Sequence, residues 1–324
     1  MGEIKQPTQA QRHLILGGDG FIGRHVALLL ARKGFSVTIA TRLPQSFAFP
    51  EAVASRISRK SFELASADWD ELVKDVDVVH HYAWSSIPAS ANANPAGDLL
   101  LNVSATIGLL DALRRKGQGR VVFTSSGGTV YGKVNRTPID EDVVLRPITA
   151  YGAGKVSAEI YLSLFRSMHG IDCRIARISN PYGAGQNVAR GLGVITTFLQ
   201  RSLTGEDIVI WGDGNVTRDF IHIADLAACL ANLAVAPPSD QFIFNVGTGL
   251  GASLNQAVTE IEKVLGRQLT VRRSPSRLID VPVNVLAIDR VCRALSWEPQ
   301  VSLSAGIENT IRDLKTGCSF SSLI

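Results

Sequence analysis

The chain has 324 residues, 45% of them hydrophobic and 19% charged, with a formal net charge of +4. This composition suits a large buried core, arranged as one enlarged domain or as two. The scattered Lys and Arg residues indicate neither a nucleic-acid partner nor a membrane surface, and the longest apolar stretch, 226–236, is too short to span a bilayer. The four cysteines lie far apart without metal-ligand spacing, which favours reduced thiols in a cytoplasmic protein over disulfides or a metal site.

A glycine-rich turn follows the first predicted strand. Residues 14–16 are a short apolar run typical of a buried parallel strand. A helical pattern follows the turn and ends at Gly34, and a second strand is predicted at 36–40. Such a turn lets a pyrophosphate approach the N-terminus of the helix closely. The residues expected to contact a dinucleotide here are Gly17, Gly20, Phe21, Ile22 and Gly23.

The stretch Leu-Gly-Gly-Asp-Gly-Phe-Ile-Gly at 16–23 resembles the opening of the extended short-chain dehydrogenases/reductases. This family includes nucleotide-sugar epimerases, dehydratases and reductases. The second strand ends at Thr41 and Arg42, without the acidic residue that would hold the ribose hydroxyls of NAD. Arg42 could instead meet the 2′-phosphate of NADP, or lie in solvent. The sequence therefore leaves NAD and NADP open.

Further motifs of the family continue along the chain. A third strand is expected at 62–64, and the resemblance places Asp68 just beyond it, near the adenine. A fourth strand, 77–83, resembles the pattern D-V-V-x-H-x-A, in which His81 is structural and Ala83 borders the cofactor. Ser85 falls in the expected substrate loop.

A serine-rich segment, 125–132, follows the fifth predicted strand at 119–124. In the family the catalytic hydroxyl stands four residues before the tyrosine of Val-Tyr-Gly, and in this chain that position is Gly127. We expect Ser126 to supply the hydroxyl and to contact the substrate, with Ser125 and Thr129 as alternatives. Without any of them, Tyr151 would act through water.

Tyr151 and Lys155 are four residues apart and share one face of a predicted helix. A phenol has a pKa near ~10 and is a poor base at neutral pH. A fixed ammonium nearby stabilises the phenolate and lowers that pKa. The pair reproduces the family motif Y-x-x-x-K, so both residues are expected to be catalytic and to contact the nicotinamide end of the cofactor.

The second half of the chain resembles the substrate-binding part of the family. Asn180 follows the sixth strand, 173–178, and Arg218 lies in an R-D-F-x-H segment. The resemblance implies that Asn180 and Arg218 contact a sugar diphosphate, that Arg277 is a second diphosphate arginine, and that Val209 and Trp211 border the base. A guanidinium fork suits phosphate oxygens.

The expected fold is α/β, a doubly wound parallel Rossmann sheet with a smaller α/β substrate-binding domain. The dinucleotide-binding domain is predicted at 12–180, with returns around 220–247, and the nucleotide-sugar-binding domain mainly at 181–324. The resemblance also implies a homodimer through two helices of the first domain.

The expected function is a nucleotide-sugar 4-epimerase, with a UDP-hexose as substrate and tightly bound NAD, or NADP, as cofactor. The alternative is an NADPH-dependent reductase of a 4-keto-6-deoxy nucleotide-sugar, which Arg42 favours. A dehydratase is disfavoured because Gly128 and Thr129 stand where related dehydratases have an Asp-Glu pair. An inactive cofactor-binding scaffold is a third hypothesis outside catalysis.

Overall fold

The computed structural model describes residues 11–42, 47–191, 193–276 and 281–317. Its main element is a seven-stranded sheet in the order β10-β6-β5-β4-β1-β2-β3, in which all neighbouring strands are parallel. The strands are β1 Arg12–Leu16, β2 Ser36–Thr41, β3 Ile57–Ser61, β4 Val78–His81, β5 Arg120–Ser126, β6 Asp172–Ile178 and β10 Ile243–Val246. The strand order reverses between β1 and β4, where open α/β sheets bind ligands. The predicted Rossmann architecture is confirmed.

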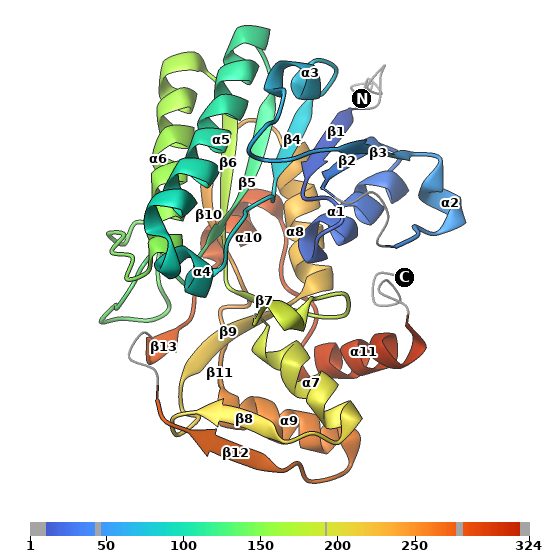
Figure 1. Cartoon of the computed structure of the whole chain (residues 1–324), viewed down its shortest axis with the longest axis vertical. Coiled ribbons are helices and arrows are strands. Elements are labelled where there is room, and N and C mark those ends of the chain that lie inside the picture. Colours follow the sequence, from blue (N-terminus) through green and yellow to red (C-terminus); the bar gives the residue numbers. More distant parts are fainter. Residues whose placement is uncertain (1–10, 43–46, 192, 277–280, 318–324) are drawn as a thin grey trace, which may run out of the picture.

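Helices cover both faces of this sheet (Figure 1). One face carries α1 Phe21–Arg32, α8 Ile223–Val235 and α10 Asp289–Leu295, and the other carries α3 Trp69–Val73, α5 Pro95–Lys116 and α6 Ala150–His169. Two short helices, α2 Glu51–Ala54 and α4 Pro88–Ala93, lie in connections. By length and composition α5 could cross a membrane, but half of its apolar window is buried inside this protein, as in the core helix of a globular domain.

A second, smaller group of elements lies below the main sheet in Figure 1. A four-stranded sheet joins β7, β9, β11 and β13, and β8 pairs with β12. The bounds are β7 Asn180–Tyr182, β8 Ile208–Trp211, β9 Thr217–His222, β11 Gly251–Ser253, β12 Val271–Ser274, β13 Val283–Asn284, α7 Val194–Thr204, α9 Leu254–Leu265, α11 Leu303–Thr316 and the 3-10 helix η1 Val188–Arg190. These elements share an apolar core of their own.

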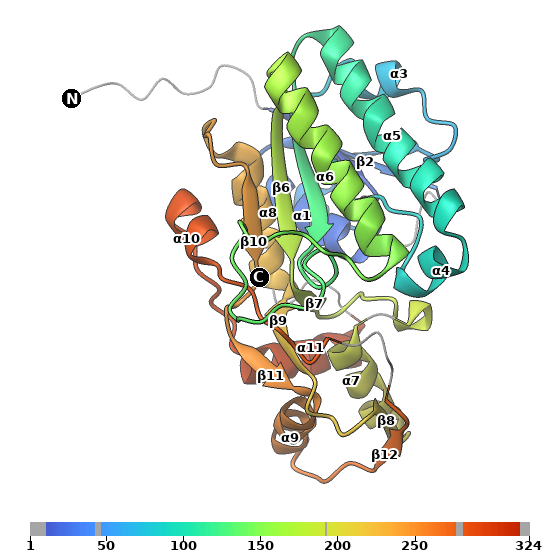
Figure 2. The ribbon, with the colours of Figure 1, turned by 90° about the vertical axis from the view of Figure 1, so that its left-hand side faces the viewer.

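The carboxyl ends of the parallel strands point toward this second group (Figure 2). Strand β6 ends at Ile178 and β7 begins at Asn180, so the chain passes from one sheet to the other within two residues. Ligands of a doubly wound sheet bind outside these carboxyl ends. The fold therefore places a binding region between the main sheet and the smaller group.

The prediction of the third strand at 62–64 was wrong. The strand is Ile57–Ser61, which lies at the edge of the sheet and is only half-buried at Ile57 and Arg59. Phe62 is buried and donates its N–H to the Thr41 carbonyl at 2.9 Å, but the chain then leaves the sheet. The apolar residues at 62 and 64 anchor the loop rather than form the strand.

Candidate active site

The glycine-rich turn is packed too closely to accept side chains at two positions. An ideal Cβ atom on Gly18 would lie 2.3 Å from Ile39 Cβ, and one on Gly23 would lie 2.4 Å from the Gly17 carbonyl oxygen. Gly20 is the N-cap of α1, and no side chain of the described residues caps this helix. Within this part of the chain, the N–H groups of its first turn therefore have no capping side chain and can bind an anion. This geometry fits a dinucleotide pyrophosphate.

Other predicted cofactor residues lie around this turn. A Cβ atom on Gly17 would lie 3.1 Å from the Ala83 backbone nitrogen, so Ala83 borders the turn from β4. Thr41 is half-buried at the end of β2, and Arg42 is exposed beside it. Asp68 caps α3, because its carboxylate accepts the Glu71 N–H at 3.1 Å.

Tyr151 and Lys155 lie in the first turns of α6. Thr149 caps this helix by accepting the Gly152 N–H at 3.1 Å. Lys155 is buried and donates to the Thr124 carbonyl at 2.8 Å. Burial lowers the pKa of Lys155 to about 7, against the opposing influence of the Glu159 and Asp98 carboxylates. The ammonium lies 5.7 Å from the centre of the Tyr151 ring, so it can stabilise a nearby phenolate.

The serine-rich segment separates its hydroxyl groups into different environments. Ser125 is buried and donates to the Glu159 carboxylate. Ser126 ends β5 half-buried, and its hydroxyl forms no hydrogen bond with the described part of the chain. The Thr129 hydroxyl is buried, again without a partner among the described residues, and its carbonyl oxygen would lie 2.6 Å from a Cβ atom on Gly152. Ser126 and Thr129 therefore have hydroxyls available, whereas Ser125 is engaged.

The Glu159 carboxylate belongs to a buried network that fixes α6 against the sheet. Arg177 on β6 donates to Glu159 at 2.7 Å and to the Tyr131 hydroxyl at 3.0 Å. Tyr131 donates in turn to the Asn245 side chain at 2.6 Å. Every charge in this network is paired and hydrogen-bonded, as burial requires. The network fixes the position of α6, which carries Tyr151, relative to β5 and β6.

The predicted substrate residues come from the smaller group of elements. Asn180 on β7 and Arg218 on β9 lie on paired strands, since Asn180 stands opposite Phe220. Arg218 donates to the Val281 carbonyl at 2.7 Å. Val209 and Trp211 lie on β8, and Trp211 is 42% exposed. Arg277 lies outside the described residues.

Two histidines at the end of β4 have structural partners. His81 is buried and pairs with the Thr106 hydroxyl at 2.9 Å, and His80 pairs with His13 at 2.9 Å and with the Tyr82 hydroxyl at 2.8 Å. Burial lowers the pKa of His81 to about 3. Both side chains are therefore neutral and hydrogen-bonded, His81 to α5 and His80 to β1 and Tyr82. Within the described ranges, no group of three His, Cys, Asp or Glu residues is placed to hold a metal ion.

Two residues beside Lys155, Trp84 and Asp98, have no signature in the sequence. Trp84 follows Ala83, and the centre of its indole ring lies 3.8 Å from Lys155 Nζ. Asp98, near the start of α5, is buried and accepts hydrogen bonds from Ser86 and from the Asn102 amide. The loop after β4 is tied to the same helix, because the Ser85 N–H donates to Asn102 at 2.8 Å. These contacts depend on tertiary packing and leave no local pattern in the sequence.

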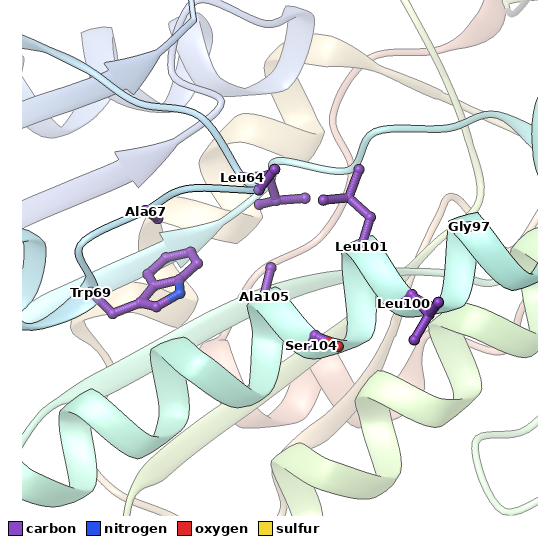
Figure 3. Close-up of a pocket in the computed structure, with 9 residues that line it drawn as sticks. Leu64, Ala67, Trp69, Gly97, Leu100, Leu101, Ser104 and Ala105 are labelled. Atoms are coloured by element: carbon purple, nitrogen blue, oxygen red, sulfur yellow. The ribbon is translucent and has the colours of Figure 1, made fainter.

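A separate pocket of about 400 Å³ lies between the segment 64–69 and α5. Figure 3 shows Leu64 and Leu101 pointing toward each other, with Trp69 and Ala105 beside them. The pocket is next to the loop that carries Asp68, and its lining includes Gly97 and Leu101 in the first turns of α5.

Comparison with known proteins agrees with this geometry. Residues 13–247 match the family described as NAD dependent epimerase/dehydratase. The chain belongs to this family. A putative UDP-glucose 4-epimerase of Methanocaldococcus jannaschii is 32% identical over 93% of this chain and 98% of the relative, and a UDP-glucose 4-epimerase of Mycolicibacterium smegmatis is 33% identical over 93% and 97%. A dTDP-4-dehydro-6-deoxyglucose reductase of Escherichia coli is 31% identical over 93% and 97%.

Solved structures of family members have the same fold. The UDP-glucose 4-epimerase of Thermotoga maritima, solved with UDP-glucose, superposes with a TM-score of 0.87 at 29% identity, covering 95% of this chain and 99% of that one. The Thermus thermophilus UDP-glucose 4-epimerase complex with NAD gives a TM-score of 0.84 at 27% identity, covering 94% and 99%. The glycine-rich turn and the Tyr151–Lys155 pair thus lie in a fold that other proteins use for NAD-dependent chemistry on UDP-sugars.

Proposed function

We propose that this protein is an NAD-dependent nucleotide-sugar 4-epimerase that acts on a UDP-hexose. The observation that carries the proposal is the position of Lys155, buried in α6 with its ammonium 5.7 Å from the Tyr151 ring. Support comes from the glycine-rich turn and from epimerase relatives that match nearly the whole chain. The expected product is the C4 epimer of the same nucleotide-sugar.

Tyr151 is the proposed acid–base catalyst. Its phenolate would accept the proton of the sugar 4-hydroxyl and later return a proton to O4. Lys155 would stabilise the phenolate by its charge, and Ser126 would hold O4 through its hydroxyl. When bound, the nicotinamide supplies reversible hydride acceptance from C4. Hydride must return to the opposite face of C4. The site between the two sheets therefore has to let the 4-keto sugar rotate before the hydride returns.

The glycine-rich turn would hold the cofactor pyrophosphate through the N–H groups of Phe21, Ile22 and Gly23. Ala83 and Thr41 would border its adenosine half. Asp68 would lie near the adenine, with one carboxylate oxygen capping α3. Tyr151 and Lys155 would contact the nicotinamide ribose.

The nucleotide-sugar would be held by the smaller group of elements. Asn180 and Arg218 lie on paired strands and would bind the diphosphate together. Arg277 is proposed as a second diphosphate ligand on the resemblance alone. Val209 and Trp211 would border the base, and Ser85 the sugar. In this arrangement 12–180 forms the dinucleotide-binding domain and 181–324 mainly the substrate domain, with α8 and β10 returning to the first.

A 4-keto-6-deoxy nucleotide-sugar reductase is the second candidate. The E. coli relative with reductase activity matches the same 93% of the chain. Arg42 is exposed at the end of β2, where a guanidinium can meet the 2′-phosphate of NADPH. An epimerase retains its cofactor between turnovers, whereas a reductase must exchange it, so cofactor retention separates the two candidates.

We further propose a homodimer through α5 and α6, two neighbouring helices on one side of the main sheet (Figure 2). Apolar side chains are exposed on both helices: Leu99, Leu100, Ile160, Leu164 and Met168, with 43% to 64% of their surface accessible. Exposed apolar side chains on two neighbouring helices are typical of an interface between subunits. Ile160→Glu should convert the protein to monomers in analytical ultracentrifugation, whereas an unchanged sedimentation coefficient would contradict this surface.

Two measurements test the proposed function. In the first, the nucleotide released from denatured protein is identified. In the second, folded protein receives UDP-galactose without added cofactor. The proposal expects released NAD and formation of UDP-glucose. A protein without bound nucleotide that oxidises NADPH only when a 4-keto sugar is added would replace the epimerase by the reductase.

A further inference from the structure

The ammonium group of Lys155 is enclosed by aromatic rings. Its Nζ atom lies 3.8 Å from the centre of the Trp84 ring and 4.7 Å from that of Phe123. One hydrogen bond, to the Thr124 carbonyl, is its polar contact on the sheet side. The side chain is 3% exposed. Two ring faces and one carbonyl oxygen therefore contact the charge directly.

Charged and titratable groups surround the Lys155 ammonium and its two aromatic rings at longer range. Glu159, one turn further along α6, is paired with Arg177. Asp98 on α5 accepts from Ser86 and Asn102. Both carboxylates raise the pKa of Lys155 through space, although burial outweighs them. His81 on β4 is buried and neutral, and Tyr151 lies on the same helix face as Lys155. Because Glu159 and Asp98 form their hydrogen bonds with other residues, the aromatic contact is a separate source of stabilisation for the cation.

We propose that Trp84 is a positioning residue, whose indole face stabilises the protonated form of Lys155 and thereby sets the pH at which Tyr151 ionises. The proposal deepens the proposed function, since it rests on Tyr151 being the acid–base catalyst. The physical reason is that the negative face of an indole attracts a cation, most strongly where water is excluded. Trp84 acts through Lys155 and need not touch the substrate.

The position of the indole is set by packing. Its Cζ2 atom would lie 3.3 Å from a Cβ atom on Gly154, one residue before Lys155, so a larger residue at 154 would displace the ring. The indole meets Phe123 and Tyr151 edge-on, at 6.0 and 6.2 Å between ring centres. Its Nε1 atom is buried and has no hydrogen-bond partner among the described residues. Since the N–H contributes no bond within this part of the chain, a phenylalanine can replace the function of the ring.

The effect on Tyr151 follows from the coupling of the two groups. If Lys155 loses its stabilising ring, neutral lysine with protonated tyrosine becomes favoured over ammonium with phenolate. The phenolate then forms only at higher pH. A change of one pH unit corresponds to a tenfold change in the ionisation equilibrium, and a desolvated cation–π contact is strong enough to cause a shift of about one unit.

The test compares Trp84→Leu with Trp84→Phe, two variants that are similar in volume and differ in the aromatic face. The phenolate absorbance of each protein is titrated and corrected by the same protein carrying Tyr151→Phe, so that only Tyr151 is observed. We expect Trp84→Leu to raise the midpoint by about one pH unit and Trp84→Phe to retain most of the wild-type value. Equal midpoints in the Leu and Phe variants would overturn the proposal.

A control variant and a substitute variant complete the comparison. Trp69→Leu removes a tryptophan that packs against Gly108 on α5, and it should leave the Tyr151 midpoint unchanged. If Trp84→Leu does not fold, Trp84→Met supplies an apolar side chain without a ring and carries the same expectation. The titration needs no substrate, so a shifted midpoint in a protein that does not epimerise UDP-hexoses would refute the proposed function and retain the role of Trp84.

Discussion

An ideal Cβ atom on Gly127 would lie 2.5 Å from Cδ1 of Leu286 and 3.2 Å from the Arg177 carbonyl oxygen. Leu286 is buried in a small cluster with Val130, Tyr131 and Ile139. A side chain at 127 would therefore enter this cluster. The family position of the hydroxyl, counted back from Val-Tyr-Gly, is occupied in this chain by a residue that has no room for one.

Gly127→Ser should consequently destabilise the protein without improving turnover. Overpacking a buried site typically costs about 1–3 kcal/mol of unfolding free energy. Leu286→Ala should recover part of this loss when combined with Gly127→Ser, because the two side chains compete for the same space. Urea denaturation of the single and double variants measures the coupling. A Gly127→Ser protein of unchanged stability and higher kcat would show that the position faces the substrate.

Ser126→Ala tests the hydroxyl that we assign to the substrate. We expect kcat to fall by about 10²-fold, within the range for removal of one catalytic hydrogen-bond donor, with little change in stability because the hydroxyl has no partner among the described residues. Ser125→Ala is the matched comparison. It removes the donor to Glu159 and should cost about 1–3 kcal/mol of stability instead. Wild-type turnover in Ser126→Ala would transfer the role to Thr129 or to water.

Tyr151→Phe removes the proposed acid–base group and retains the ring. Turnover should fall by orders of magnitude, since general acid–base catalysis contributes about 10²–10⁴-fold. The contact between the Tyr151 and Trp84 rings should persist, so the unfolding free energy should change little. Steady-state kinetics together with thermal unfolding separate the two effects. Near wild-type rates in this variant would refute the mechanism.

Buried histidines with lowered pKa values predict a loss of stability in acid. Burial lowers the pKa of His13 and His222 to about 4 and that of His81 to about 3, and it lowers the pKa of His80 well below the usual value. The folded pKa values lie below the unfolded value near ~6.5, so the unfolded chain binds more protons as the pH falls. His13, His81 and His222 should each remove about 2 kcal/mol of stability between pH 7 and pH 5, and His80 acts in the same direction.

Denaturant unfolding at a series of pH values measures this dependence. His222 caps α8 through the Ala224 N–H at 3.3 Å, and His222→Asn keeps a capping side chain while removing the imidazole. This variant should show a shallower decline below pH 6.5 than the wild-type protein. A free energy of unfolding that stays constant from pH 7 to pH 5 would contradict the prediction.

The sequence predicted those parts of the protein whose cause is local. The glycine-rich turn, the strands of the sheet interior and the face shared by Tyr151 and Lys155 each follow from spacing and side-chain type. The edge strand β3 could not be predicted, because Ile57-Ser58-Arg59-Lys60-Ser61 is polar and partly exposed. Its neighbour, the apolar Phe62, indicated a strand where the chain had already left the sheet.

The environment of the candidate site depends on contacts between distant residues. Trp84 meets Lys155 across 71 positions of the chain, and Gly127 meets Leu286 across 159. No pattern within a single element predicts such pairs. The resemblance predicted Asp68 near the adenine, and the structure adds that its carboxylate caps α3, a role that depends on where the helix begins.

In the proposed mechanism, hydride leaves C4 and returns to it without exchanging with water, while Tyr151 moves the proton. Epimerisation of UDP-galactose in D₂O tests this step when the product is analysed by NMR for deuterium at C4. We expect UDP-glucose with protium at C4, formed without added cofactor. Deuterium at C4, or no interconversion by protein that contains NAD, would refute the mechanism.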